Sequence, residues 1–349
     1  MNVSVTNACN RRCEYCFQKD WYLAKKATPG PGSGVVEMSP EEFDRLCQWA
    51  VDRSHIKLMG GEPLLHSHLP SLIEVARKYG KTISFISNIS IDPAGFKGLL
   101  REFDKNEGTV RGFLVNTDYP AAQEADFKEN LEYLFKNQPY LPALSTTLLP
   151  DLEETRKAVQ RIKELGEIYK SINGNDIANL RVRVSPYAPN PRDFVQYEIC
   201  DFTDIALELL KSLSDYGLRS VNFDCPVNCC EIWGEMLDEI RRAGTVQIRT
   251  RACAPNAGMP FDVLVDHSVI WCSSASFIRL SDWREYQNVI EARSALEEKY
   301  YKWWNEHDEN ANCSACKERV CKRCSGLCIA KTYALEKSHK AIQINGIRW

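Results

Sequence analysis

The chain has 349 residues, of which 15 are cysteine, and its 44 Lys and Arg against 47 Asp and Glu leave a formal net charge of -3. A chain of this length can bury a full core without disulfides, and an odd number of cysteines cannot all pair within one chain. The balanced charge provides no sequence-wide basic field, so we expect no nucleic acid and no membrane among the partners.

Two further features of the sequence bear on the compartment. No apolar run reaches the roughly 18 residues of a membrane-spanning helix, and the N-terminus lacks the charged and then apolar layout of a signal peptide. We therefore expect a cytoplasmic protein. In that reducing compartment many thiols indicate metal or redox chemistry rather than disulfides.

Short β-rich runs alternate with helical patterns over roughly the first 220 residues. Strands are predicted at 2–6, 55–59, 82–87, 112–116, 144–149 and 180–185. Helices are predicted at 40–53, 69–79, 93–103, 121–137, 152–165 and 202–216. Ser39, Asp92 and Asp151 stand at N-cap positions and support three of these helices. Six strand–helix units in sequence predict parallel strands with right-handed crossovers.

We predict an α/β fold, a partial (β/α)6 TIM-like barrel, with a doubly wound sheet as the alternative. In both architectures the functional site lies at the carboxyl ends of the strands. A segment rich in Gly and Pro at 20–38 lies on that side, and is interpreted as a solvated loop or as a lid. After residue 218 the alternation fails, so we predict one domain at 1–218 and a small Cys-rich domain at 219–349. The second domain contains a hairpin signal at 261–272 and a helix at about 282–305.

The cysteines fall into three groups, one at the N-terminus, one spread through the last third and one crowded near the end. In that order the members are Cys9, Cys13 and Cys16; Cys225, Cys229, Cys230, Cys253 and Cys272; and Cys313, Cys316, Cys321, Cys324 and Cys328. Cys47 and Cys200 stand apart in helical patterns, where the role of a small buried hydrophobe is expected.

The first group, Cys9, Cys13 and Cys16, spans eight residues and comes soon after the first predicted strand. Four thiolates would saturate a [4Fe–4S] cluster, whereas three leave one iron open for another ligand, as in catalytic metal sites. A structural zinc site would need a fourth Cys or His nearby, and after Cys16 the sequence has none before Cys47. Zinc or a purely structural role is the alternative.

This loop resembles the signature of the radical S-adenosylmethionine (radical SAM) enzymes, which is Cys-x3-Cys-x2-Cys after the first strand of a partial barrel. Tyr15 occupies the aromatic position that the family has before the third cysteine. The run Gly60-Gly61-Glu62-Pro63 after the second strand is similar to the family's Gly-Gly-Glu-Pro motif, whose edge binds the methionine amino group of SAM. Two glycines let a backbone approach a ligand closely, and we expect their amides to bond to its polar groups.

Weaker matches stand at later strand ends. The resemblance implies contacts with SAM by Ser87 and Asn88 after the third strand, by Asn116 after the fourth, and by Arg183 on the sixth. Arg183 could pair with the SAM carboxylate. Ordinary strand-end polar residues, or a surface arginine, are the alternatives, and no catalytic acid or base is assigned.

The resemblance implies a [4Fe–4S] cluster on the first cysteine group, with SAM chelated at the open iron. An external one-electron donor such as flavodoxin or ferredoxin would reduce the cluster. Reductive cleavage of SAM would release methionine and a 5'-deoxyadenosyl radical, which takes a hydrogen atom from the substrate. The protein's task would be to orient the reactants and exclude water.

The late cysteines resemble the SPASM extension of radical SAM enzymes, which carries two auxiliary [4Fe–4S] clusters. His267 stands where that pattern has glycine at a hairpin turn, and a left-handed backbone would tolerate it. The spacer between Cys316 and Cys321 is one residue shorter than in the pattern, and no cysteine follows Cys328. A zinc knot is the alternative for the last group.

One ligand assignment accommodates both departures. Cys313, Cys316, Cys321 and Cys324 would hold one auxiliary cluster, and Cys225, Cys253, Cys272 and Cys328 the other. Cys229 and Cys230 are alternatives to Cys225 in that second set, and simple buried thiols are the alternative for all three.

Auxiliary clusters in this family imply a redox role, so we expect oxidative modification of a peptide by crosslinking, epimerisation or dehydrogenation. The first strand begins at about residue 2, so we expect no fused leader-peptide-binding domain and allow for a separate leader-peptide-binding protein. A radical SAM dehydrogenase of a small-molecule alcohol or sugar is one alternative. A non-catalytic iron–sulfur electron carrier is another, although a carrier has no use for a SAM-binding edge.

Overall fold

The computed structural model describes residues 1–13, 15–16, 34–106, 108–137, 142–149, 151–174, 177, 179–186, 199–223, 261–272, 275–307, 343–344 and 347–348. The chain divides into two compact units. The first is Met1–Ala143 with Pro260–Lys299, and the second is Leu144–Met259 with Tyr300–Trp349. The domain boundary that the sequence predicts at residue 218 stays a prediction.

The first unit is built on parallel strands. The strands β1 (Asn2–Thr6), β2 (His55–Gly60), β3 (Thr82–Ser87) and β4 (Val110–Asn116) are neighbours in that order. On the other side of β1 lies β8 (Asp262–Val263), also parallel, followed by the antiparallel strands β9 (Val269–Ile270) and β10 (Arg279–Leu280). A segment about 260 residues away in the chain therefore pairs with the first strand, and Asn2 Nδ2 donates a hydrogen bond of 2.7 Å to Asp262 Oδ1.

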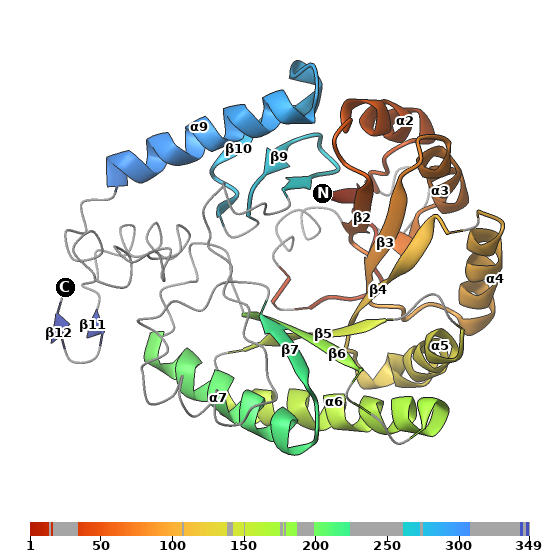
Figure 1. Ribbon diagram of the computed structural model, residues 1–349, viewed down its shortest axis with the longest axis vertical. Helices are drawn as coiled ribbons and strands as arrows, with labels where there is room; N and C mark the ends of the chain where they lie inside the picture. Colours follow the sequence, from red (N-terminus) through yellow and green to blue (C-terminus); the bar gives the residue numbers. More distant parts are fainter. Residues whose placement is uncertain are drawn as a thin grey trace. The chain divides into compact units, whose positions relative to one another are not determined.

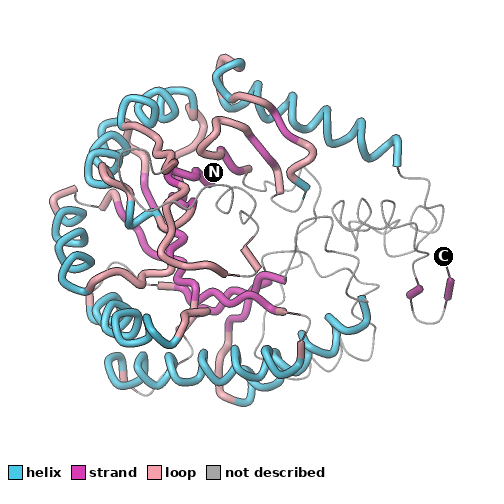
Figure 2. The backbone as a smooth tube through the Cα atoms, turned by 180° about the vertical axis from the view of Figure 1, so that it is seen from behind, coloured by secondary structure: helices cyan, strands magenta, loops and turns pink. Residues whose placement is uncertain are grey.

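Helices alternate with these strands, and α2, α3 and α4 lie along the outer side of β2 to β4 (Figure 1). The helical elements of the unit are α2 (Pro40–Trp49), η1 (Pro63–Leu65), α3 (Leu69–Lys78), α4 (Pro93–Asp104), η2 (Ala121–Gln123), α5 (Glu124–Lys136), η6 (Trp283–Glu285) and α9 (Val289–His307), of which α9 runs past the end of the unit. Figure 2 shows the same alternation from behind. The core lies between the two layers, where Phe85 of β3 stacks against Phe103 and Phe113 at ring distances of 5.4 and 5.0 Å.

The predicted capping signals are present where they can be checked. Ser39 and Glu42 form a reciprocal capping box at the start of α2, while Asp92 caps α4 by accepting a bond of 2.8 Å from the N–H of Gly95. Such caps satisfy backbone N–H groups that the first helical turn leaves without partners.

The second unit contains the parallel strands β5 (Ala143–Leu148), β6 (Arg181–Pro186) and β7 (Ser220–Phe223). Its long helices are α6 (Leu152–Asn173) and α7 (Ile199–Asp215), and β11 (Gln343–Ile344) pairs with β12 (Ile347–Arg348) in a short antiparallel ladder. All six predicted strands are found, with ends shifted by at most two residues. The strand β7 was not predicted.

The prediction of an α/β fold with parallel strands is confirmed, and the alternation is consistent with a partial TIM-like barrel. The described helices include none with the length and apolar character needed to cross a membrane. Residues 20–33 of the predicted loop or lid lie outside the described residues. The returning segment pairs with the first strand, because the N–H of Met38 donates to the carbonyl of Val5 at 2.8 Å.

Candidate active site

The cysteine loop begins directly after β1. Cys9, Cys13 and Cys16 are all partly buried. The N–H of Arg11 donates to Cys9 Sγ at 3.4 Å, and the N–H of Cys16 donates to the carbonyl of Cys13 at 3.2 Å. The loop therefore turns back on itself and presents three sulfurs from eight residues at the carboxyl end of the first strand.

The chemistry of these thiols fits an iron–sulfur cluster. Burial, together with the negative charge of Glu62 and the other two thiols, raises the pKa of Cys9 to about 12, although the Arg11 N–H opposes this. A cation bound at the sulfur is what makes a thiolate favourable in such a place. In the described part of the chain no three or more His, Cys, Asp or Glu side chains converge on one ion. A cubane cluster does not require such convergence, because each thiolate binds a different iron.

The two glycines of Gly60-Gly61 lie against the backbone that leads into the cysteine loop. A Cβ on Gly61 would lie 2.0 Å from the carbonyl oxygen of Ala8, and one on Gly60, whose φ is +140°, would lie 2.2 Å from that of Thr6. The N–H of Gly61 donates to Thr6 O at 2.8 Å, and the N–H of Glu62 donates to Ala8 O at 2.7 Å. We expected the amides of the glycine pair to bond to a ligand. The N–H of Gly61 instead holds the cysteine loop, and the close approach is between two backbones.

The carboxylate of Glu62 ties the same turn to β3. The side chain is fully buried, and Oε1 accepts bonds from Ser87 Oγ at 2.7 Å and from the N–H of Leu64 at 3.1 Å. Oε2 accepts a bond of 2.7 Å from the N–H of Asn88. Burial raises the pKa of Glu62, although these bonds and the charge of Arg11 oppose the rise. Glu62 thus positions Ser87 and Asn88 rather than facing solvent.

The turn after β3 is strained and braced. Ile89 is a buried β-branched residue with φ of +46°, a conformation that such residues rarely adopt. Nδ2 of the buried Asn130 on α5 donates to the carbonyls of Ile89 and Ile91, both at 2.8 Å. From the other side, Asn88 Nδ2 donates to Asn10 Oδ1 of the cysteine loop at 2.9 Å. The end of β3 is therefore held in one position next to the loop.

The aromatic residue of the cysteine motif reaches the end of β4. Tyr15 OH donates to Asn116 Oδ1 at 3.3 Å, and the same oxygen accepts the N–H of Asp118 at 2.9 Å. Burial raises the pKa of Tyr15, and the negative charge of Asp118 adds to the rise. Among the predicted SAM contacts, the structure brings Tyr15, Glu62, Asn88 and Asn116 around the cysteine loop. Their roles toward a cofactor stay predictions.

The predicted roles of Arg183 and of the late cysteines stay predictions. Arg183 lies on β6 of the second unit, opposite Ser145 and Asn222 in the strand register. The other predicted cluster ligands lie outside the described residues, except Cys272, which lies after β9 and is partly buried. The residues outside are Cys225, Cys229, Cys230, Cys253, Cys313, Cys316, Cys321, Cys324 and Cys328.

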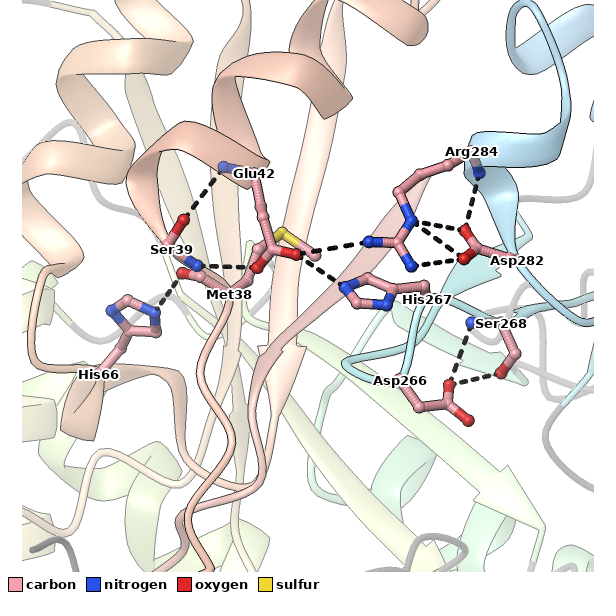
Figure 3. A network of polar contacts seen from close by, with 9 residues as sticks. All are labelled: Met38, Ser39, Glu42, His66, Asp266, His267, Ser268, Asp282 and Arg284. Carbon is pink, nitrogen blue, oxygen red and sulfur yellow. Dashed lines mark hydrogen bonds and ion pairs between the residues drawn. The ribbon is translucent and has the colours of Figure 1, made fainter. Parts of the chain in front are cut away.

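The hairpin before Cys272 has the turn that the sequence indicates. His267 has φ of +71°, so it adopts the left-handed conformation expected for a residue in a glycine position. Its Nε2 lies 2.9 Å from Glu42 Oε1, and Arg284, paired with Asp282, approaches the same carboxylate oxygen at 3.9 Å (Figure 3). The capping box of α2 thus also anchors the hairpin.

Sequence reasoning missed the polar residues that brace the loop, namely Asn10, Arg11, Ser90, Gln123 and Asn130. Arg11 is the largest omission, because it is only 6% exposed although it lies in a polar loop. Its position between two motif cysteines is the one signal that could have marked it.

The family model of the radical SAM superfamily matches residues 3–166, which include the cysteine loop, the glycine pair and the ends of β3 and β4. Residues 3–166 form a radical SAM domain. The resemblance that the cysteine motif indicates is confirmed over these residues, and it implies a [4Fe–4S] cluster and SAM. The match over these residues supports an enzyme, and radical SAM enzymes take electrons from an external donor. The SPASM extension stays a prediction.

Relatives found by sequence comparison are named GTP 3',8-cyclases. A GTP 3',8-cyclase of Helicobacter pylori (strain HPAG1) is 26% identical over 309 residues, which cover 85% of this chain and 83% of the relative. A probable GTP 3',8-cyclase of Methanothermobacter marburgensis is 28% identical over 130 residues, which cover 34% of this chain and 39% of that protein.

Solved structures resemble the fold. Streptococcus suis SuiB bound to its precursor peptide SuiA has a TM-score of 0.59 at 11% identity, covering 94% of this chain and 71% of that chain. SuiB bound to S-adenosylmethionine has a TM-score of 0.57 at 11% identity, covering 94% of this chain and 72% of that chain. At this identity the likeness describes the fold alone.

Proposed function

We propose that this protein is a radical SAM enzyme that cleaves SAM reductively and oxidatively modifies a peptide. Cys9, Cys13 and Cys16 would hold a [4Fe–4S] cluster, and SAM would lie at the ends of β2, β3 and β4. When bound, the cluster and SAM supply a one-electron cleavage that yields a 5'-deoxyadenosyl radical, which takes a hydrogen atom from the substrate. The observation that carries the proposal is the backbone pairing of Gly61 and Glu62 with Thr6 and Ala8.

That pairing connects the two motifs physically. The segment between β1 and Cys9 is held by two amide hydrogen bonds, so the cysteine loop leaves the sheet at a fixed place beside the turn after β2. Glu62 extends the connection to β3, and Tyr15 extends it to β4. The protein's own contribution would be this rigid arrangement, which holds reacting groups in position.

Two features support a peptide as the substrate. The late cysteine pattern resembles that of peptide-modifying radical SAM enzymes, and the fold is similar to that of SuiB, whose solved structure contains a precursor peptide. Two auxiliary clusters on the late cysteines would bring the iron content to about twelve per chain, against about four for the N-terminal cluster alone. A separate leader-peptide-binding protein and an external donor such as flavodoxin or ferredoxin would be the partners.

A purine nucleotide is the second candidate substrate. The specific observation in its favour is the 26% identity to a GTP 3',8-cyclase over 85% of this chain. A cyclase reaction would rearrange the nucleotide without net oxidation. A small-molecule alcohol or sugar stays the further alternative, and an electron carrier is the non-enzyme alternative.

Parallel anaerobic reactions separate these candidates. The full chain, reconstituted with iron and sulfide, is given SAM and dithionite with GTP, with an alcohol or sugar, or with the synthetic peptide of any short open reading frame that is found beside its gene. Peptide modification predicts 5'-deoxyadenosine together with a peptide that has lost two hydrogens, or has gained one deuterium in heavy water after epimerisation. A cyclised nucleotide with an unchanged peptide would overturn the peptide proposal in favour of the second candidate. Loss of two hydrogens from an added alcohol or sugar would support the third.

A further inference from the structure

Arg11 lies between the first two motif cysteines as a buried cation. Its Nε donates to Gln123 Oε1 and its Nη1 to the carbonyl of Asp118, both at 3.1 Å. Its Nη2 donates to the carbonyl of Asn88 at 3.1 Å and to Ser90 Oγ at 2.5 Å. The four acceptors come from the ends of β3 and β4 and from η2, so one guanidinium joins the cysteine loop to both strand ends.

All four acceptors are neutral. Among the ion pairs found in the described part of the chain none involves Arg11, and the remaining contact of its guanidinium is with the ring of Phe127 at 5.8 Å. The carboxylates of Glu62 and Asp118 are close enough to act on its charge without forming an ion pair with it. A buried charge is costly unless it is paired, so this arginine requires a negative partner nearby.

The motif thiols on either side of Arg11 are the candidates for that partner, and the N–H of Arg11 itself donates to Cys9 Sγ at 3.4 Å. Of the negative groups that act on the Arg11 charge, Cys13 has the largest effect. A [4Fe–4S]2+ core on three thiolates carries one net negative charge, and it carries two after it has accepted one electron. A cation in a low-dielectric place attracts the second state more strongly than the first.

We propose that Arg11 is the buried counter-charge of the N-terminal cluster and makes its one-electron reduction easier. The inference rests on the proposed function, because it requires a cluster on Cys9, Cys13 and Cys16. Arg11 is a positioning residue, since it acts through the cluster and through the strand ends that it holds. The electron comes from the external donor, and no bond to Arg11 forms or breaks.

The test is the midpoint potential of the N-terminal cluster, measured by electron paramagnetic resonance during a redox titration of the full chain. We expect Arg11→Gln and Arg11→Met to lower the midpoint potential by about 59 mV, which corresponds to a tenfold less favourable one-electron reduction. Arg11→Lys keeps the charge and is expected to retain most of the wild-type potential. Arg12→Gln is the matched control, because Arg12 carries the same charge one residue later but is exposed to water.

The possible outcomes distinguish the two proposals. A wild-type protein that binds no cluster overturns the proposed function. A cluster that cleaves SAM in the wild type, with the same potential in Arg11→Gln, overturns only the role of Arg11. If the neutral variants fail to bind iron, the charge account still expects Arg11→Lys to bind it. Equal loss of iron in Arg11→Lys would mean that the guanidinium acts through its hydrogen bonds alone and would overturn the inference.

Discussion

The N–H of Glu62 donates a hydrogen bond of 2.7 Å to the carbonyl of Ala8, the residue directly before the first motif cysteine. Two motifs that are about fifty residues apart in the chain therefore share one backbone pairing. The arrangement gives a structural reason for both glycines, since neither position leaves room for a Cβ. It also makes the geometry of the cysteine loop depend on residues that do not bind iron.

The first prediction concerns Gly61. In Gly61→Ala the new Cβ would start 2.0 Å from Ala8 O, so one of the two backbones must move. We expect a loss of about 1–3 kcal/mol in the free energy of unfolding, together with weaker iron binding. Chemical denaturation and iron analysis measure both. The control is Gly98→Ala in α4, where the added methyl meets open space and is expected to stabilise the protein by about 0.5–1 kcal/mol. Equal stability of the two variants would contradict the account.

The second prediction concerns Asn130. Its amide holds the carbonyls of Ile89 and Ile91, and Asn130→Ala leaves both without that donor. We expect a cost of about 2–4 kcal/mol in the free energy of unfolding, measured by urea denaturation. Asn137→Ala at the end of the same helix loses one bond of 2.7 Å to Tyr133 O near the surface, so a cost of under about 1 kcal/mol is expected. If both variants lost the same free energy of unfolding, the two bonds of Asn130 would not stabilise the strained turn more than an ordinary surface bond does.

The third prediction is a pH dependence at His66. Its buried ring donates from Nε2 to the carbonyl of Met38 and accepts the N–H of His68 at Nδ1, both at 3.0 Å, so protonation of Nδ1 would break the second bond. Burial lowers the pKa of His66 below its ordinary 6.5.

The unfolded chain therefore binds this proton more readily than the folded chain. The free energy of unfolding falls as the pH drops below about 6.5 toward the lowered pKa, by at most about 1.4 kcal/mol per pH unit. Thermal unfolding from pH 7.5 to 5 measures it. Removing the ring in His66→Gln should flatten this part of the profile, and the exposed His68→Gln should keep it. A profile unchanged in His66→Gln would refute the assignment.

The fourth prediction concerns the backbone at His267. Asn tolerates its φ of +71°, whereas a β-branched residue does not. His267→Asn and His267→Val both lose the ring that contacts Glu42, so the difference between them isolates the backbone strain. We expect the Val variant to be less stable by about 1–2 kcal/mol in thermal unfolding. Variants of equal stability would show that the turn relaxes.

Local patterns accounted for most of the elements. The cap at Ser39 predicted the start of α2, and the alternation of strands and helices predicted the parallel strands, because both signals are short-range. The strand β7 was missed because it is only four residues long. Helix α6 runs past Gly166, since that glycine is a packing position where a Cβ would lie 2.6 Å from Tyr216 Oη and not a stop signal.

The candidate site also contains residues that the sequence predicted and residues that only the fold reveals. Spacing alone singled out Cys9, Cys13 and Cys16, because a cluster-binding loop is contiguous in the chain. The pairing of β1 with β8 and the four bonds of Arg11 join residues far apart in sequence, and no local pattern encodes them. An arginine in a polar loop is ordinarily read as exposed, so its burial could be learned only from the fold.

The central claim is that the cysteine loop supports reductive cleavage of SAM. It is tested most directly by the amount of 5'-deoxyadenosine formed when the anaerobically reconstituted full chain is given dithionite and SAM. We predict formation by the wild type and by Cys47→Ala, whose cysteine is buried in α2 and is not part of the motif, and none by Cys13→Ala. No 5'-deoxyadenosine from a wild-type protein with its cluster in place, or equal amounts from Cys13→Ala, would contradict the account.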